Sequence, residues 1–176
     1  MKWKFRQYKK WLKYGHELNY EVTELYLGNK KFYDLKHINN LPNLRILHCY
    51  GNNINDLSNL DLPMLEELIC SKSVIYKMDN IKLPKLKHLS CNINNIKELI
   101  LDCPEIEMLT CEKNKLKTLT IKNSHKLKVM SCYGNCIKKL KLYPLCLELL
   151  DCRLNESIDI DFDYAPGFYK LYVSEY

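Results

Sequence analysis

The sequence predicts an α/β fold, a right-handed solenoid that is mostly β, with about eight short parallel strands behind one N-terminal helix. Three observations support this prediction. A unit of 20 to 22 residues recurs along the chain, which is typical of repeat architectures. Each unit opens with apolar and polar residues in alternation, the period of a half-buried strand. The first fourteen residues follow the period of an amphipathic helix instead.

The N-terminal segment, residues 1–21, is predicted to be a capping helix. Its apolar and cationic side chains fall on opposite arcs, and Gly15 follows as a stop signal. Because the first coil of a solenoid exposes its core, we expect this helix to cover the coil that begins at Val22. An alternative is contact with a polyanion or a membrane surface. The apolar arc contains Trp3, Phe5, Tyr8, Trp11, Leu12 and Tyr14, and the cationic arc contains Lys2, Arg6, Lys9, Lys10 and Lys13.

The repeats occupy residues 22–155 and share the pattern Leu-x-x-Leu-x-Cys-x-x-Asn-x-Ile-x-x-Leu. One unit is too short to bury its own apolar face, so the units must stack to remove that face from water. The repeated Asn is expected to bond backbone groups in each bend, with Ser73 as the weak position. The sixth-position cysteines are Cys49, Cys70, Cys91, Cys111, Cys132 and Cys152, and the ninth-position asparagines are Asn52, Asn94, Asn114, Asn135 and Asn155.

This repeat resembles the leucine-rich repeat family over about residues 22–176. It departs from the family in placing Cys at the sixth position. The second half of many units repeats Leu-x-x-Leu-x-Leu, which is similar to short bacterial and viral variants, so the resemblance implies little helix on the convex side. The abundance of Lys, Asn, Ile and Tyr, with Cys in the repeat, looks like leucine-rich-repeat proteins of giant amoeba-infecting viruses.

Residues 156–176 are predicted to form a C-terminal cap with a final partial repeat. Residues 158–163 alternate in strand fashion. Phe168, Leu171 and Val173 then keep the apolar positions of an opening strand. This segment should cover the core at the far end of the solenoid.

Composition indicates a globular chain kept in a reducing compartment. The nine cysteines are odd in number and no stretch has the apolar length of a signal peptide or membrane span, so we expect free thiols in the cytoplasm, or the host cytoplasm if the source is a virus. The net charge is +6, of which residues 1–20 carry +5. Attraction to polyanions is therefore expected at the N-terminus.

Residues 131–136, Ser-Cys-Tyr-Gly-Asn-Cys, raise the question of a redox or metal site. A zinc site needs four converging ligands, whereas Cys132 should face the core and Cys136 should lie past the bend. We expect the thiols to be structural, with no metal and no cofactor. Cys103, Cys136 and Cys146 fall outside the repeated column and are expected to be partly exposed.

One possible catalytic grouping is Glu67, His88 and Ser90 on the concave face, an acid, a base and a hydroxyl. No oxyanion-stabilising or water-excluding element accompanies it in the sequence. We expect an exposed Glu–His pair, no catalytic residues and no enzyme activity.

The concave face is predicted to bind a protein partner of unknown identity. Apolar and aromatic side chains gather in two groups beside charged ones, as in protein interfaces. Scattered surface hydrophobes are the competing interpretation. Few basic residues project from this face, which argues against nucleic-acid binding there. The predicted contact residues are Ile46, His48, Tyr50 and Ile69, and Met108, Glu112, Val129, Tyr133, Leu149, Asp151 and Arg153.

Overall fold

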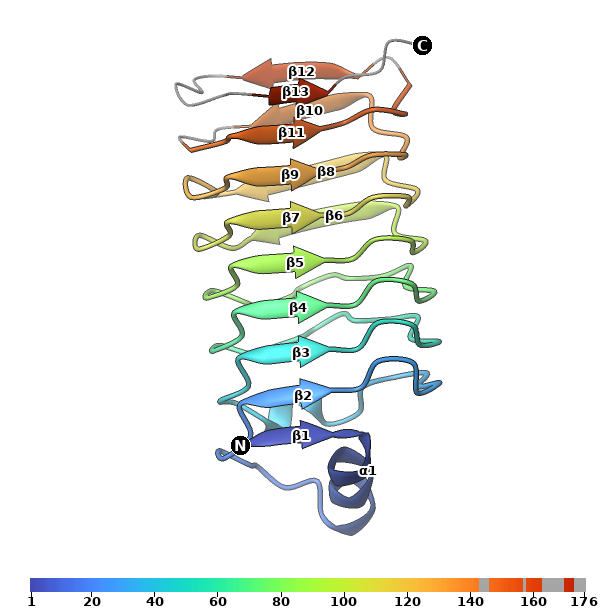
Figure 1. Ribbon diagram of the computed structural model, residues 1–176, viewed down its shortest axis with the longest axis vertical. Coiled ribbons are helices and arrows are strands. Elements are labelled where there is room, and N and C mark those ends of the chain that lie inside the picture. Colours follow the sequence, from blue (N-terminus) through green and yellow to red (C-terminus); the bar gives the residue numbers. More distant parts are fainter. Residues whose placement is uncertain (143–145, 157, 163–169, 173–176) are drawn as a thin grey trace.

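The computed structural model describes residues 1–142, 146–156, 158–162 and 170–172, which form a solenoid of stacked coils (Figure 1). One face of the described part is a nine-stranded parallel sheet. Eight of these strands come from the repeats, as predicted. In spatial order the strands are β1 (Lys2–Lys4), β2 (Glu24–Tyr26), β3 (Ile46–His48), β4 (Glu67–Ile69), β5 (His88–Ser90), β7 (Met108–Thr110), β9 (Val129–Ser131), β11 (Leu149–Asp151) and β13 (Lys170–Tyr172).

In every strand of this sheet except β13, the central residue is buried in the core and the two flanking residues take the outward positions. In β3, Leu47 is fully buried while Ile46 and His48 are half-buried. The pairing is in register, with Ile46 opposite Glu67 and His48 opposite Ile69. Because the register repeats along the sheet, each outward position of the repeat forms a straight column across the concave face.

The opposite face carries four strands in two separate pairs, with one short 3-10 helix, η1 (Ile38–Asn40). The expectation of little convex helix is thus confirmed for the described residues. The pairs are β6 (Glu98–Asp102) with β8 (Thr118–Lys122), and β10 (Lys139–Leu142) with β12 (Asp159–Phe162).

At the N-terminus, the helix α1 (Phe5–Tyr14) packs on the first coils and ends before Gly15. Tyr8 is fully buried, and its hydroxyl donates a 2.9 Å hydrogen bond to the Lys36 carbonyl oxygen. The helix is shorter than predicted, since Lys2–Lys4 form strand β1 and extend the sheet. The Lys-Trp-Lys alternation suits a strand edge, because Trp3 enters the core between two outward lysines. Tyr14, assigned to the apolar arc, is 70% exposed.

At the C-terminal end, β12 pairs with β10 and β13 pairs with β11. The predicted strand over residues 158–163 is therefore present at Asp159–Phe162. Leu171 lies in β13 and is 43% exposed. Phe168 and Val173, which the sequence assigns to the same unit, lie outside the described residues.

The six sixth-position cysteines form a continuous column in the core. Each is fully buried and each thiol is free. Cys103 is also buried, which corrects the expectation that it is partly exposed: it follows strand β6, whose Leu101 points the same way into the core. Burial raises the pKa of Cys49 and of Cys91 to about 12, so both thiols stay protonated at neutral pH.

The ninth-position asparagines form the predicted ladder. Asn114 is typical: its Nδ2 donates to the carbonyl oxygens of Cys111, 3.1 Å away in the same coil, and of Cys91, 3.0 Å away in the preceding coil. Its Oδ1 accepts from the Ile96 backbone N–H at 3.1 Å. One amide thus pairs buried backbone groups of two coils. Asn52, Asn94, Asn135 and Asn155 bond in the same manner.

The residue before each of these asparagines adopts a left-handed backbone conformation. Gly51 and Gly134 have φ of +63° and +66°. Ile93 occupies the equivalent site with φ +55°, although it is β-branched and 43% exposed. Such a residue is strained there, because its side chain crowds its own backbone.

We expect Ser73→Asn to stabilise the protein by about 1 kcal/mol. Ser73 Oγ accepts one 3.3 Å hydrogen bond, from the Asn52 backbone N–H, and is too short to reach two coils as the asparagines do. Urea denaturation followed by circular dichroism measures the change. The reverse exchange, Asn94→Ser, is the matched control and should destabilise by about 1–3 kcal/mol. No gain from Ser73→Asn would contradict the bridging role of the amide.

Ile93→Gly should also stabilise, by about 1 kcal/mol. Relief of the left-handed strain contributes roughly 1–2 kcal/mol, and the greater entropy of glycine in the unfolded chain takes back part of it. Thermal unfolding measures the shift. Gly134→Ile places the same side chain at the same site of another coil and should lower the melting temperature; a rise in that variant would show that the conformation is unstrained.

Candidate functional site

Three apolar side chains of the predicted contact set form one column on the concave face. Met108, Val129 and Leu149 are in register on the neighbouring strands β7, β9 and β11. Met108 is 41% exposed, and the other two are half-buried. Adjacent strands lie about 4.8 Å apart, so these side chains make one continuous apolar stripe.

Beside this stripe, an arginine lies between two tyrosine rings at the edge of the concave face. The Arg153 guanidinium lies 5.7 Å from the Tyr133 ring centroid and 4.8 Å from that of Tyr172. Two hydrogen bonds to Asp151, 3.0 Å from Nε and 2.7 Å from Nη2, fix its orientation. Burial favours a raised pKa for Asp151, but the bonds from Arg153 outweigh it, so this pKa lies below its ordinary value.

Tyr172 completes this stack, and the contact residues chosen from the sequence do not include it. It belongs to β13, in register with Asp151. The signal available in the sequence was its place in the fifth-position column, next to Asp151. Its role depends on the reach of Arg153 across one coil, which repeat spacing alone does not reveal.

Ser131 lies between these two features and has an unpaired hydroxyl. Its side chain is in register with Thr110 and Asp151, and the residue is 6% exposed. Among the described residues no donor or acceptor pairs with its Oγ. Ser131 holds an outward position of β9 and is nevertheless buried. A buried hydroxyl without a partner costs free energy.

The first group of predicted contact residues is tied by a hydrogen bond to Glu67, which lies outside that group. His48 Nε2 lies 2.5 Å from Glu67 Oε1, on the next strand. The His48 ring also meets Tyr26 edge to face at 4.9 Å between centroids. Ile46 and Ile69 flank these groups in different columns and are half-buried. His48 is therefore held in place by its neighbours.

Tyr50 lies at the edge of the same group and covers Gly28. A Cβ atom at Gly28 would lie 2.5 Å from the Tyr50 ring, so only glycine leaves room for it. Tyr50 is 38% exposed. Glu112 takes the equivalent position further along the solenoid and is half-buried, next to Tyr133 in the same column.

The structure does not assemble the catalytic grouping that the sequence suggested. Glu67 binds His48 closely, while its other oxygen is 3.9 Å from His88 Nδ1. The Ser90 hydroxyl bonds Ser71 at 2.9 Å and Thr110 at 3.1 Å. The serine is thus engaged in a hydroxyl chain along the sheet, away from any base.

A column of alternating charges runs along the flank of the sheet, at the position before each strand. Glu66 bonds Arg45 at 2.7 Å and Lys87 at 3.0 Å, and these two cations lower the pKa of Glu66 to about 2. Glu107 and Lys128 continue the column with a 2.8 Å ion pair. The alternation of charge at this position is visible in the sequence, but it lies outside the concave positions from which the contact residues were predicted. The opposite charges along this flank neutralise one another.

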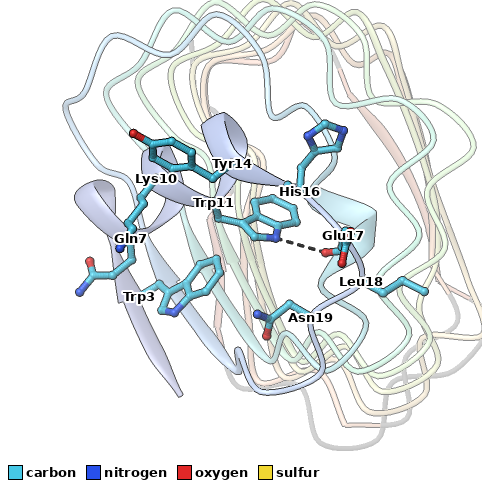
Figure 2. A pocket seen from close by; sticks show the side chains of 10 residues that line it. Trp3, Gln7, Lys10, Trp11, Tyr14, His16, Glu17, Leu18 and Asn19 are labelled. Atoms are coloured by element: carbon cyan, nitrogen blue, oxygen red, sulfur yellow. Dashed lines mark hydrogen bonds between the residues drawn. The ribbon is translucent and has the colours of Figure 1, made fainter.

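A cleft of about 500 Å³ opens at the N-terminal end, between α1 and the segment that follows it (Figure 2). Trp3 and Trp11 form its wall, with ring centroids 5.9 Å apart. Trp11 Nε1 donates a 3.2 Å hydrogen bond to the Glu17 carbonyl oxygen, which ties the segment back to the helix. Sequence reasoning assigned both rings to the core contact of the cap. The cleft shows that one side of this aromatic pair faces solvent.

Within the described ranges, no three His, Cys, Asp or Glu side chains converge as metal ligands would. Cys132 and Cys136, the pair in Ser-Cys-Tyr-Gly-Asn-Cys, point to different environments, since Cys132 is buried and Cys136 is exposed. Cys146 is exposed as well, as expected. No helix in the described chain has the length and apolar character needed to cross a bilayer.

No protein-family model and no curated protein matches the chain. Among solved structures, it superposes on YopM from Yersinia enterocolitica WA-314 with a TM-score of 0.74 and 26% sequence identity, over 89% of this chain and 34% of that one. The chain therefore spans about a third of the length of YopM. The functional domain of InlJ from Listeria monocytogenes, described as including a cysteine ladder, matches over 88% of this chain and 49% of its own at 18% identity, but with a TM-score of only 0.35.

The superposition on YopM confirms the resemblance drawn from the repeat. The fold is a leucine-rich-repeat solenoid of about eight turns with one N-terminal helix. Solenoids of this kind typically bind proteins. The column geometry described above is therefore the place to look for a partner.

Thiol labelling tests the placement of the two neighbouring cysteines. Under native conditions Cys136 and Cys146 should react with a maleimide within minutes, while Cys132 stays unmodified, because burial both blocks access and raises its pKa. Peptide mass spectrometry after a timed quench identifies the sites. The same reaction in denaturant is the control and should modify all nine thiols. Earlier labelling of Cys132 than of Cys136 would refute this register.

Proposed function

We propose that the protein is a non-catalytic interaction module that binds a protein partner on the concave face. The observation that carries the proposal is the apolar stripe of Met108, Val129 and Leu149, together with the Tyr133–Arg153–Tyr172 stack at the edge of the same face. Tyr and Arg are enriched among the residues that dominate interface energies. The Arg153 guanidinium is already held by Asp151 before binding.

The surroundings of the stripe support the same proposal. Asp151 and Glu112 place carboxylates at its edge, as in an interface whose apolar centre has a polar rim. Ile46, His48, Tyr50 and Ile69 form a second contact area, separated from the first by the Ser90 strand β5.

The alternative function is binding of a polyanion or a membrane surface by the basic N-terminal helix. The positions of its aromatic residues support this alternative less well. Tyr8 and Trp3 are buried, at 0% and 8% exposure, so they are engaged in the core and are not available to a membrane surface. Lys9 lies 5.3 Å from the Phe5 ring centroid within the helix itself. These contacts favour a capping role.

Met108→Glu should weaken partner binding at least tenfold without unfolding the protein. A charge placed within a desolvated apolar interface costs about 1–3 kcal/mol or more. The matched control is Val74→Glu, which introduces the same charge at an apolar side chain that is 45% exposed and lies outside the strands of the concave sheet.

The measurement has two steps. Affinity capture with the wild type and both variants identifies proteins that Met108→Glu loses and Val74→Glu keeps. Titration of such a protein then gives the dissociation constants. If the captured set is the same for both variants, the concave stripe is not the binding site. Circular dichroism confirms that both variants remain folded.

A further inference from the structure

The convex face carries a concentration of lysines. The net charge does not reveal it, because residues 1–20 carry +5 of the total of +6. Residues 113–147 contain nine lysines and one histidine, with no Asp or Glu. Three of the lysines are engaged on the concave side or its flank: Lys113 near Tyr133, Lys126 with Glu105 and Lys128 with Glu107. Of the remaining six, Lys122, Lys139 and Lys141 lie in the convex strands β8 and β10, and Lys117 and Lys138 directly precede those strands.

These lysines surround a recess of about 750 Å³ between the two convex strand pairs. β8 pairs with β6 and β10 pairs with β12, so the recess lies where the convex sheet is interrupted. Buried Leu119 and Ile121 form its apolar base, and the hydroxyl-bearing Thr118 and Thr120 alternate with them on the outward side of β8. Its basic lining consists of Lys117, Lys122, Lys138, Lys139, Lys141 and His125.

Four of these lysines are not neutralised within the protein. Over the described residues, Lys117, Lys122, Lys138 and Lys139 take part in no ion pair, and all four are exposed. Lys141 is different, since its Nζ lies 3.7 Å from Asp161. Four like charges held this close repel one another, and an anionic ligand would relieve that repulsion.

Acidic residues bound the basic strip on both sides. Glu98 and Asp102 lie on β6, in register with Thr118 and Lys122 of β8. Asp159 and Asp161 lie on β12, in register with Lys139 and Lys141 of β10. The strip is therefore two coils wide, about 10 Å, and one five-residue strand long, about 17 Å.

From this geometry we propose that the convex recess binds an extended acidic peptide segment of a partner protein. A chain of five or six residues in strand conformation has this length and width. Its carboxylates would meet the lysines, and its backbone could bond the threonine hydroxyls at the base. This surface is separate from the concave face and does not depend on the function proposed for it.

Other polyanions fit the recess less well. A nucleic-acid duplex carries phosphates on both sides of grooves about 6 and 12 Å wide, which would bring some of them against the flanking acids. Single strands are held largely by stacking on several aromatic rings, whereas the recess is lined by no Phe, Tyr or Trp and by the single imidazole of His125. A bilayer is flat and favours exposed aromatic and aliphatic groups beside the cations, whereas the apolar side chains here are buried below them.

Fluorescence anisotropy with a labelled octaglutamate peptide tests the proposal at 50 mM and 300 mM salt. The recess variant is Lys117→Gln, Lys122→Gln and Lys138→Gln. The matched control is Lys9→Gln, Lys10→Gln and Lys13→Gln, which removes the same charge from α1. Octaglutamine, a 20-base-pair duplex and phosphatidylserine vesicles are the comparison ligands.

We expect wild type to bind octaglutamate at low salt, with affinity falling at high salt because the contacts are screened. The recess variant should bind at least tenfold more weakly, since three charged contacts are lost at roughly two- to fivefold each, and the α1 variant should change less than twofold. Equal losses in both variants would attribute binding to net charge alone. Absence of wild-type binding, or tighter binding of the duplex or the vesicles than of the peptide, would also overturn the proposal.

Discussion

The asparagine amide that joins consecutive coils is the interaction on which the rest of the structure depends. In Asn114, one side chain pairs the carbonyl oxygens of Cys91 and Cys111 with the Ile96 N–H, groups that would otherwise be buried without partners. These bonds fix the bend after each strand. The side chains just before the bend, including Tyr133 and Arg153, thereby keep a constant height on the edge of the concave face.

Much of the fold could be predicted because the same sequence pattern recurs in six units, and each unit independently indicates the same coil. The buried cysteine column, the asparagine ladder and the strand register all follow from positions that recur with a constant period. Features without a repeat were harder. Lys2–Lys4 is three residues long, and its alternation fits a strand as well as the start of the helix. Cys103 occupies the position of Leu41, Leu62 and Leu83, which are all buried, but this position lies outside the fourteen-residue pattern that defines the repeat.

Predicting the candidate site from sequence was limited by side-chain reach. Columns place Met108, Val129 and Leu149 together because the backbone alone decides their neighbours. The Glu67–His48 contact runs diagonally between two columns, and Arg153 reaches over to Tyr172 on the next coil. Such contacts depend on rotamers and on which of several neighbours competes for a group. For Glu67, His48 is the closer partner, so the expected pairing with His88 became secondary.

The buried thiol column has a consequence for how this solenoid opens. Six consecutive coils each contribute one buried cysteine to the column, and each coil is held mainly by the coils beside it. A coil that separates from its neighbours exposes its own thiol, while thiols elsewhere in the column stay covered. Local opening of the solenoid can therefore be followed by thiol modification. The modification rate of each cysteine reports the free energy of opening at that turn, including the turns on either side of Ser73.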